Sequence, residues 1–366
     1  MTYGLGRYAY GLFVPEIRAD YGLGTTVLGI IASGSYGAYL GATALSAGLA
    51  ERLGARRLVV AGGLATAAGM ALVAAGSGVA AAAVGVIVAG SGSGLVWPAL
   101  SDAVQRNIPD GARVRALALV NSGTSYAVAL AGPVALAAGD RWRAAWVVFA
   151  GISLTVTAWC AATVPPTRTH PEALPPFGRA LFAREGAAAL LAFALASGLG
   201  TAMYWTFAAD LVADRHGGSA TAGQVLMTVV GVAGIAGGAV GSFTARFGLA
   251  RTLVAGTLAN ALGTALLPAA AGAWAGVAAS AVLFGATFIL VAGGAALWTV
   301  AIFGDRPAAG IGALTVVFTV GSMVGPAALG AVGGAFGLPV AFGASAAVLT
   351  AAALVAARAP RAKMGP

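Results

Sequence analysis

The chain has 366 residues, of which 59% are hydrophobic and only 8% are charged, and its formal net charge is +9. Soluble domains carry roughly 25% charged residues, so the composition excludes an ordinary soluble protein. The basic residues lie in short segments between apolar runs, which argues against a nucleic-acid partner and for a lipid bilayer. The single cysteine, Cys160, excludes an intramolecular disulfide framework.

Eleven apolar runs are long enough to cross a bilayer, which takes about 20 residues. They lie near 25–50, 57–76, 79–103, 113–137, 142–164, 187–211, 222–245, 251–271, 274–303, 309–335 and 338–357. Residues 1–16 form a twelfth candidate that is too short. Its counterpart in the second half begins near Ala187, so we expect the first helix to be truncated at its start, or its start codon to be assigned too late.

The chain repeats itself at an offset of 194 residues. Gly4-Leu5-Gly6 returns as Gly198-Leu199-Gly200, and the segment 47–54 is matched by 241–248. A repeat this long in a membrane chain predicts two equivalent helical bundles with a shared site between them. We expect bundles at 1–164 and 187–366, joined by a cytoplasmic linker at 165–186 that contains five prolines.

The distribution of basic residues predicts the orientation. If both termini are cytoplasmic, 15 of the 20 lysines and arginines fall on the cytoplasmic side and four fall outside. Basic residues favour the cytoplasmic side of membrane proteins. The sequence therefore predicts a multi-pass protein of the inner (plasma) membrane with both termini inside.

The segment Gly48–Arg57, Gly-Leu-Ala-Glu-Arg-Leu-Gly-Ala-Arg-Arg, resembles the signature between helices two and three of the major facilitator superfamily. The opening Gly4–Tyr10, Gly-Leu-Gly-Arg-Tyr-Ala-Tyr, resembles the YbfB-like bacterial branch of that superfamily. This resemblance implies an all-α membrane protein with the major facilitator fold, in which two six-helix bundles are related by a pseudo-two-fold axis. It also implies a secondary transporter that works as a monomer by alternating access, without a cofactor.

The signature loop predicts a latch that holds one face of the carrier closed. An acid at a helix end can accept hydrogen bonds from a neighbouring helix N-terminus, and nearby arginines can pair with an acid on another helix. The latch candidates are Glu51, Arg52, Arg56, Asp102 and Arg246, the last from the partial second copy of the loop. The alternative is that the arginines only set the topology, which we favour for Arg52.

Arg7 is the strongest candidate for a residue that contacts the substrate. A charge at helix centre costs about 2.5–3.5 kcal/mol on insertion scales, so it normally faces a cavity or a partner. In the superfamily, helices one, four, seven and ten line the cavity, so Arg7 would present a positive charge to an anionic substrate. The alternative is a structural pair with a neighbouring helix. Further binding candidates are Tyr10, Trp97, Asn121, Tyr204, Trp205, Trp298 and Thr315, with core packing as the alternative for each.

Glu16 and Asp210 occupy equivalent repeat positions and are the candidates for ion coupling, with solvated helix ends as the alternative. Enzymatic chemistry lacks candidates. His170 and His216 fall in loops, no cluster has metal-ligand spacing, and the only lysine, Lys363, excludes a Walker A motif. The leading interpretation is transport of a small organic anion. Multidrug-type efflux and a non-transporting receptor on the same fold are the alternatives.

Overall fold

The computed structural model describes residues 1–166, 184–304 and 306–360, and within these ranges it contains helices and no strand. The predicted linker with His170 lies mostly outside the described residues. The first half of the chain forms α1 (Thr2–Leu12), α2 (Val14–Tyr21), α3 (Thr25–Ala75), α4 (Val79–Asn107), α5 (Asp110–Ala138) and α6 (Trp142–Thr163). The second half forms α8 (Ala187–Arg215), α9 (Ala220–Ala236), the 3₁₀ turn η1 (Gly237–Ala239), α10 (Val240–Phe247), α11 (Leu249–Ala270), α12 (Trp274–Ile302), α13 (Pro307–Phe336) and α14 (Leu338–Ala356).

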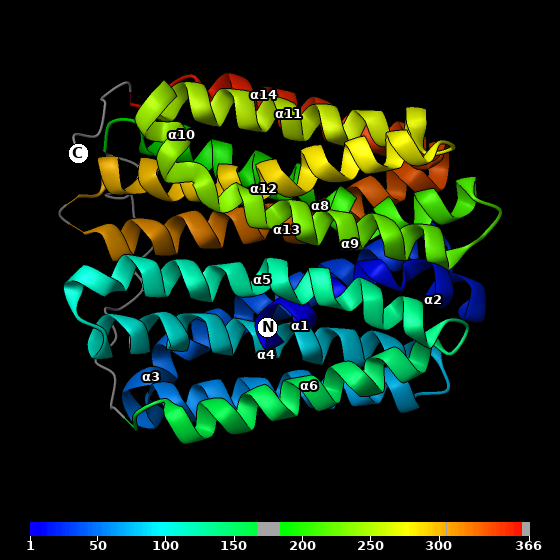
Figure 1. Cartoon of the computed structure of the whole chain (residues 1–366), viewed down its shortest axis with the longest axis horizontal. Coiled ribbons are helices and arrows are strands. Elements are labelled where there is room, and N and C mark those ends of the chain that lie inside the picture. The colour runs from blue at the N-terminus through cyan, green and yellow to red at the C-terminus, as the bar shows by residue number, and fades with distance from the viewer. Residues whose placement is uncertain (167–183, 305, 361–366) are drawn as a thin grey trace.

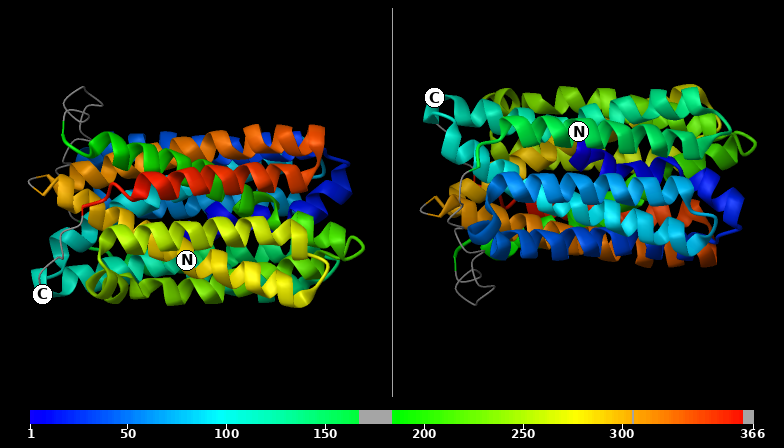
Figure 2. Two further views of the ribbon diagram at one scale, coloured as in Figure 1. Left: turned by 90° about the horizontal axis from the view of Figure 1, so that it is seen from above. Right: turned by 90° about the horizontal axis from the view of Figure 1, so that it is seen from below.

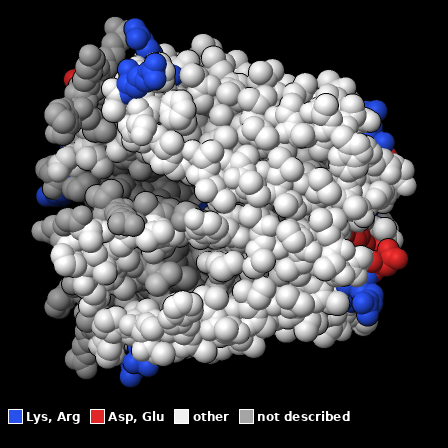
Figure 3. All heavy atoms as spheres, in the orientation of Figure 1, with Lys and Arg blue, Asp and Glu red and all other residues white. Residues whose placement is uncertain are grey.

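The long helices run side by side along one axis of the molecule (Figures 1 and 2). The short helix α2 lies at one end, called here the α2 end, and α6 ends and α8 begins at the opposite end, called here the linker end (Figure 1). On the face in Figure 3, charged side chains gather at the two ends and leave an uncharged band between them. Nine helical segments of the described chain are long and apolar enough to cross a membrane. The protein is a multi-pass membrane protein, as predicted.

The first candidate helix is divided in two. α1 ends at Leu12, Phe13 has φ −106° and ψ 11°, and α2 begins at Val14. Pro15 lies in the first turn of α2. Proline has no backbone N–H, and the N–H groups of a first turn have no acceptor within the helix, so the proline costs no helical hydrogen bond there. This break sets α2 apart from α1 and carries Glu16 and Arg18 toward the second half of the chain.

The internal repeat is visible in the backbone at two equivalent glycines. Gly54 interrupts α3 with φ 76° and ψ 161°, and Gly248 separates α10 from α11 with φ 83° and ψ 156°. This combination of angles is essentially restricted to glycine. Two glycines that are 194 residues apart therefore make the same turn between successive helices, which is where the signature loop and its partial copy were recognised.

The two halves meet mainly through α3 with α13, α5 with α9, and α1 with α8, and α2 also contacts α8 and α9. The α3–α13 crossing is close because a Cβ at Gly29 would overlap the carbonyl oxygen of Pro326. Four residues later in α3, Ser33 Oγ accepts a hydrogen bond of 3.0 Å from the backbone N–H of Ala327. Small residues in membrane helices allow such backbone approach, which explains the use of glycine here.

Candidate functional site

Buried apolar residues join the two halves at the α2 end and not at the linker end of the described chain. At the α2 end a single cluster contains residues of both halves. It includes Phe13, which is the N-cap residue of α2, and Phe207 of α8. At the linker end the described residues form two separate clusters, one around Leu58 in the first half and one around Leu190 in the second. The face in Figure 3 is hollowed toward the linker end and closed toward the α2 end. Among the described residues, the two halves are thus joined at the α2 end and separate at the linker end.

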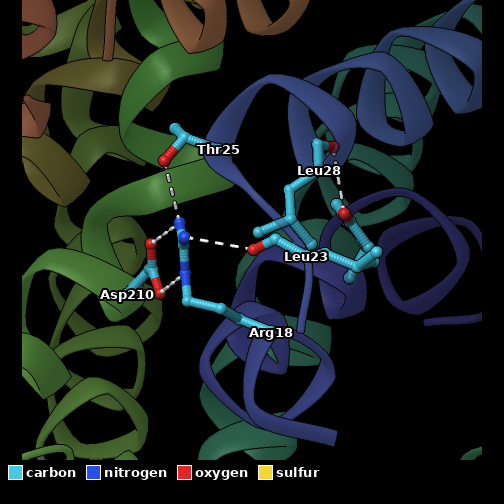
Figure 4. Close-up of polar contacts among 6 residues, drawn as sticks. Arg18, Leu23, Thr25, Leu28 and Asp210 are labelled. Atoms are coloured by element: carbon cyan, nitrogen blue, oxygen red, sulfur yellow. Dashed lines mark hydrogen bonds and ion pairs between the residues drawn. The ribbon is translucent and has the colours of Figure 1, made fainter. Parts of the chain in front are cut away.

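An ion pair crosses between the halves at the α2 end. Arg18 of α2 donates from Nε to Oδ1 of Asp210 at 2.9 Å and from Nη2 to Oδ2 at 2.6 Å. The same guanidinium donates to the carbonyl oxygen of Leu23 at 3.2 Å and to Thr25 Oγ1 at 3.1 Å (Figure 4). Asp210 is only 5% exposed, so it is not a solvated helix end. Paired hydrogen bonds between charged groups are among the strong ones in proteins.

A second polar contact crosses between the halves close to this ion pair. Gln224 of α9, which is buried, donates from Nε2 to Oε1 of Glu16 at 2.9 Å. The other carboxyl oxygen of Glu16 is buried and has no hydrogen-bond partner among the described residues. The two acids at equivalent repeat positions therefore both face the opposite half of the chain. We call the four residues Arg18, Asp210, Glu16 and Gln224 the clasp.

Arg7 lies inside a cage of tyrosines. Its Nη1 donates to Tyr3 Oη at 2.9 Å, and its Cζ lies 4.7 Å from the ring centroid of Tyr39. The rings of Tyr8 and Tyr36 lie 5.3 and 5.4 Å from the same atom. A cation over aromatic faces gains about 0.5–2 kcal/mol per contact, which offsets part of the cost of burial.

The cage leaves the charge of Arg7 uncompensated. Within the described chain Arg7 forms no ion pair, and its buried Nε has no hydrogen-bond partner. Tyr36 and Tyr39 of α3 lie 11 and 14 residues after its first residue, about 17–21 Å along the helix at 1.5 Å per residue. The hydrocarbon core of a bilayer is about 30 Å thick, so we expect Arg7 to lie near its middle. Arg7 is half-buried, so part of its side chain meets open space.

The other predicted binding residues are spread over several environments. Trp97 lines a cavity beside the start of α1 and packs at 6.1 Å from the ring of Tyr3. Trp205 packs at 4.3 Å from Tyr8 across the boundary between the halves. These two aromatic residues border the cage, whereas the side chain of Asn121 lies outside the described ones.

Four predicted candidates already have structural partners. The Tyr10 hydroxyl donates to the carbonyl oxygen of Leu28 at 3.0 Å, and the Tyr204 hydroxyl shares a 2.9 Å hydrogen bond with Ser280. Thr315 Oγ1 donates to the carbonyl oxygen of Ile311, within its own helix. Trp298 is fully buried against Phe193 in the linker-end cluster of the second half. None of these contacts involves Arg7 or its cage.

The predicted latch residues gather at the linker end. Arg56 and Asp102 are half-buried, and Arg52 and Arg246 are exposed. The guanidinium of Arg246 lies 5.3 Å from the ring of its neighbour Phe247. The side chain of Glu51 lies outside the described ones, so the latch stays a prediction.

Comparison with known families decides the class of protein. The sequence matches, over residues 1–357, a family described as the uncharacterised MFS-type transporter YbfB. The chain belongs to this transporter family. A search of curated proteins finds no match to the sequence.

Solved structures of major facilitator transporters share the fold of this YbfB-type chain. One is a bacterial homologue of the human lysosomal transporter Spinster, in an inward-facing and occupied conformation, with a TM-score of 0.73 and 15% identity. That match covers 98% of this chain and 94% of the other. Another is a mutant of the nucleoside transporter NupG, with a TM-score of 0.74, 13% identity, and 97% of each chain covered. The YbfB-type chain has the 12-helix major facilitator fold that the sequence predicted.

Sequence reasoning missed two members of the clasp, Arg18 and Gln224. Arg18 is one of the four basic residues that the sequence places outside, and Gln224 is not among the sequence candidates. The signal that could have identified Arg18 was its position in the repeat. An arginine two residues after Glu16 stands at the end of helix one, and Asp210 stands at the equivalent end of helix seven. Helices at equivalent repeat positions meet across the boundary between the halves, so opposite charges at their ends are candidates for pairing.

Proposed function

We propose that this transporter is a secondary carrier that moves a small organic anion across the cytoplasmic membrane. The observation that supports this substrate class is Arg7, a guanidinium near mid-membrane that no described carboxylate neutralises. A buried charge without a counter-charge is costly in the membrane, and functional sites are where such charges are retained. An anion bound at Arg7 would remove this cost, and a guanidinium offers a planar carboxylate two parallel hydrogen bonds.

The proposed mechanism is alternating access. The halves meet through the clasp and one shared apolar cluster at the α2 end, and the face in Figure 3 is hollowed toward the linker end. Rocking of the halves about the level of Arg7 would open the α2 end and break the clasp. The loops of the linker end would then approach each other, which is where we propose that Glu51, Arg56 and Asp102 act as a latch. Both termini are proposed to be cytoplasmic, in line with the distribution of basic residues.

The experiment is a binding screen on the purified full-length protein. Thermal stability in detergent is measured against a panel of metabolite anions and neutral amphipathic drugs, and hits are confirmed by uptake into proteoliposomes. Losing a hydrogen-bonded charge pair costs about 1.5–3 kcal/mol, so Arg7→Ala should weaken anion binding about 10- to 100-fold. Arg143→Ala is the matched control, because Arg143 pairs with Asp20 at the α2 end, away from the cage.

The outcomes separate the candidate substrates. Anion binding that is lost in Arg7→Ala and kept in Arg143→Ala supports the proposal. Anion binding that survives Arg7→Ala undiminished, or binding of neutral drugs alone, contradicts it.

A further inference from the structure

Two buried N–H groups without a described partner lie near Tyr8. One is Nε of Arg7, which has no partner among the described residues. The other is the indole Nε1 of Trp205, which equally lacks a described partner. Tyr8 lies 5.3 Å from the Arg7 guanidinium and its ring lies 4.3 Å from that of Trp205. Arg7 belongs to α1 and Trp205 to α8, so the two donors come from opposite halves of the chain.

Packing explains the indole ring of Trp205 but not its unpaired N–H. The ring contacts Phe284 and Phe288 edge-on, at 5.5 and 5.2 Å. The preceding residue, Tyr204, has its hydroxyl satisfied by Ser280. Buried polar groups without a partner are uncommon, and each one calls for an explanation. A ligand that accepts from Trp205 would supply one.

Two other tryptophans leave their N–H unpaired within the described chain, and they differ from Trp205 in position. Trp146 packs on Phe149 inside the first half, and Trp298 packs on Phe193 inside the second. By contrast, Trp205 touches a residue of the opposite half that is itself part of the Arg7 cage. Its donor is therefore close to the proposed binding site, whereas theirs are within the core of one half.

The charge of the site limits the ligand. The two acids and the arginine of the clasp lie at the α2 end, and the latch candidates lie at the linker end. Arg7 is the charged member of the cage, and its other members are tyrosines. A ligand with one negative charge would be neutralised there, whereas a second negative charge would face aromatic rings and no cation among the described residues.

We propose that the substrate is a small monocarboxylate that carries a second hydrogen-bond acceptor, such as a keto or hydroxyl oxygen. The carboxylate binds Arg7, and the indole N–H of Trp205 donates to the second oxygen. The bound ligand would thereby connect the two halves, and Trp205 sets its specificity. This inference depends on the proposed anion-transport function and adds the identity of the second contact.

The test compares ligands that differ in one oxygen. Binding of butanoate, 2-oxobutanoate, 2-hydroxybutanoate and succinate is measured by calorimetry on the full-length protein, on Trp205→Phe and on the control Trp146→Phe. The wild type should bind the 2-oxo or 2-hydroxy acid about three- to tenfold more tightly than butanoate, as expected for one neutral hydrogen bond. Succinate should bind most weakly. Trp205→Phe should abolish the preference, so that the oxygenated acids bind no more tightly than butanoate, whereas Trp146→Phe should keep the preference.

Two results would overturn this inference without touching the proposed function: equal affinities for butanoate and both oxygenated acids in the wild type, or a preference that survives in Trp205→Phe. If Trp205→Phe does not fold, Trp205→Leu is used, and the wild-type ligand series still decides. Failure of the proposed function itself would look different, because no monocarboxylate would then show binding that depends on Arg7.

Discussion

Arg18 in α2 and Asp210 in α8 are joined by two parallel hydrogen bonds across the boundary between the halves of the chain. The two residues are 192 positions apart in sequence. Their pairing, together with the contact of Glu16 with Gln224, connects the halves at the α2 end, where the apolar core is also continuous. In the proposed alternating-access mechanism these contacts belong to one state and must break in the other.

The Arg18–Asp210 pair should favour the state that is closed at the α2 end. Asp210→Asn removes the charge of a buried partner, which costs about 1–3 kcal/mol. The check uses Cys160→Ala, which removes the single cysteine, with Ser33→Cys added at the α3–α13 crossing. We expect maleimide labelling of that new cysteine to rise at least about fivefold when Asp210→Asn is added.

Two comparisons sharpen this prediction. The exchange Arg18→Asp with Asp210→Arg should bring labelling back toward the starting rate. Arg143→Gln, which breaks the exposed pair with Asp20, should have little effect, since surface pairs contribute about 0–1 kcal/mol. An unchanged labelling rate in Asp210→Asn would show that the pair does not control access at this end.

The Glu16–Gln224 contact should stabilise the protein, because it gives the carboxyl group of Glu16 a hydrogen bond. Gln224→Met keeps the side-chain length but removes the donor, so Glu16 is left buried without its hydrogen bond. Unfolding in detergent should become easier by about 1–3 kcal/mol. In the double variant Glu16→Met/Gln224→Met both polar partners are gone, and stability should recover most of that loss. A double variant less stable than Gln224→Met would contradict this account.

Two glycines of α3 should respond differently to alanine. A Cβ at Gly29 would overlap the backbone of α13 at Pro326, whereas a Cβ at Gly41 meets nothing within 4 Å. Overpacking of a close contact costs about 1–3 kcal/mol, so Gly29→Ala should lower the thermal unfolding temperature. Gly41→Ala in the same helix should stay within about 0.5 kcal/mol of the wild type. Equal effects of the two changes would argue against the close α3–α13 crossing.

The repeated turn can be tested at its two copies. Gly54 and Gly248 have positive φ with ψ near 160°, a conformation that costs other residues about 1–3 kcal/mol. Alanine at either position should destabilise the protein by a similar amount, measured by thermal unfolding in detergent. Gly78, with φ −146° and no neighbour near its Cβ position, serves as the control and should tolerate alanine. Loss of stability at only one of the two copies would contradict their structural equivalence.

The sequence by itself determined the spans, the repeat and the class of protein. Apolar length and composition decide which segments enter a bilayer, and these are local properties of the chain. The signature turn could be found for the same reason, since Gly54 and Gly248 adopt backbone angles that follow from residue type. Arg7 could be singled out because an arginine within an apolar helix is costly wherever the rest of the chain lies.

Tertiary structure alone decided which polar groups meet. The partner of Arg18 lies 192 residues away and that of Glu16 lies 208 residues away, so neither pairing leaves a local pattern. Two tyrosines of the Arg7 cage, Tyr3 and Tyr8, lie on its own helix and are close in sequence. The other two, Tyr36 and Tyr39, come from α3 and are distant in sequence. Local hydrophobicity places each helix in the membrane, but the approach of one half to the other decides which side chains share a low-dielectric space, where an unpaired donor or charge is most costly.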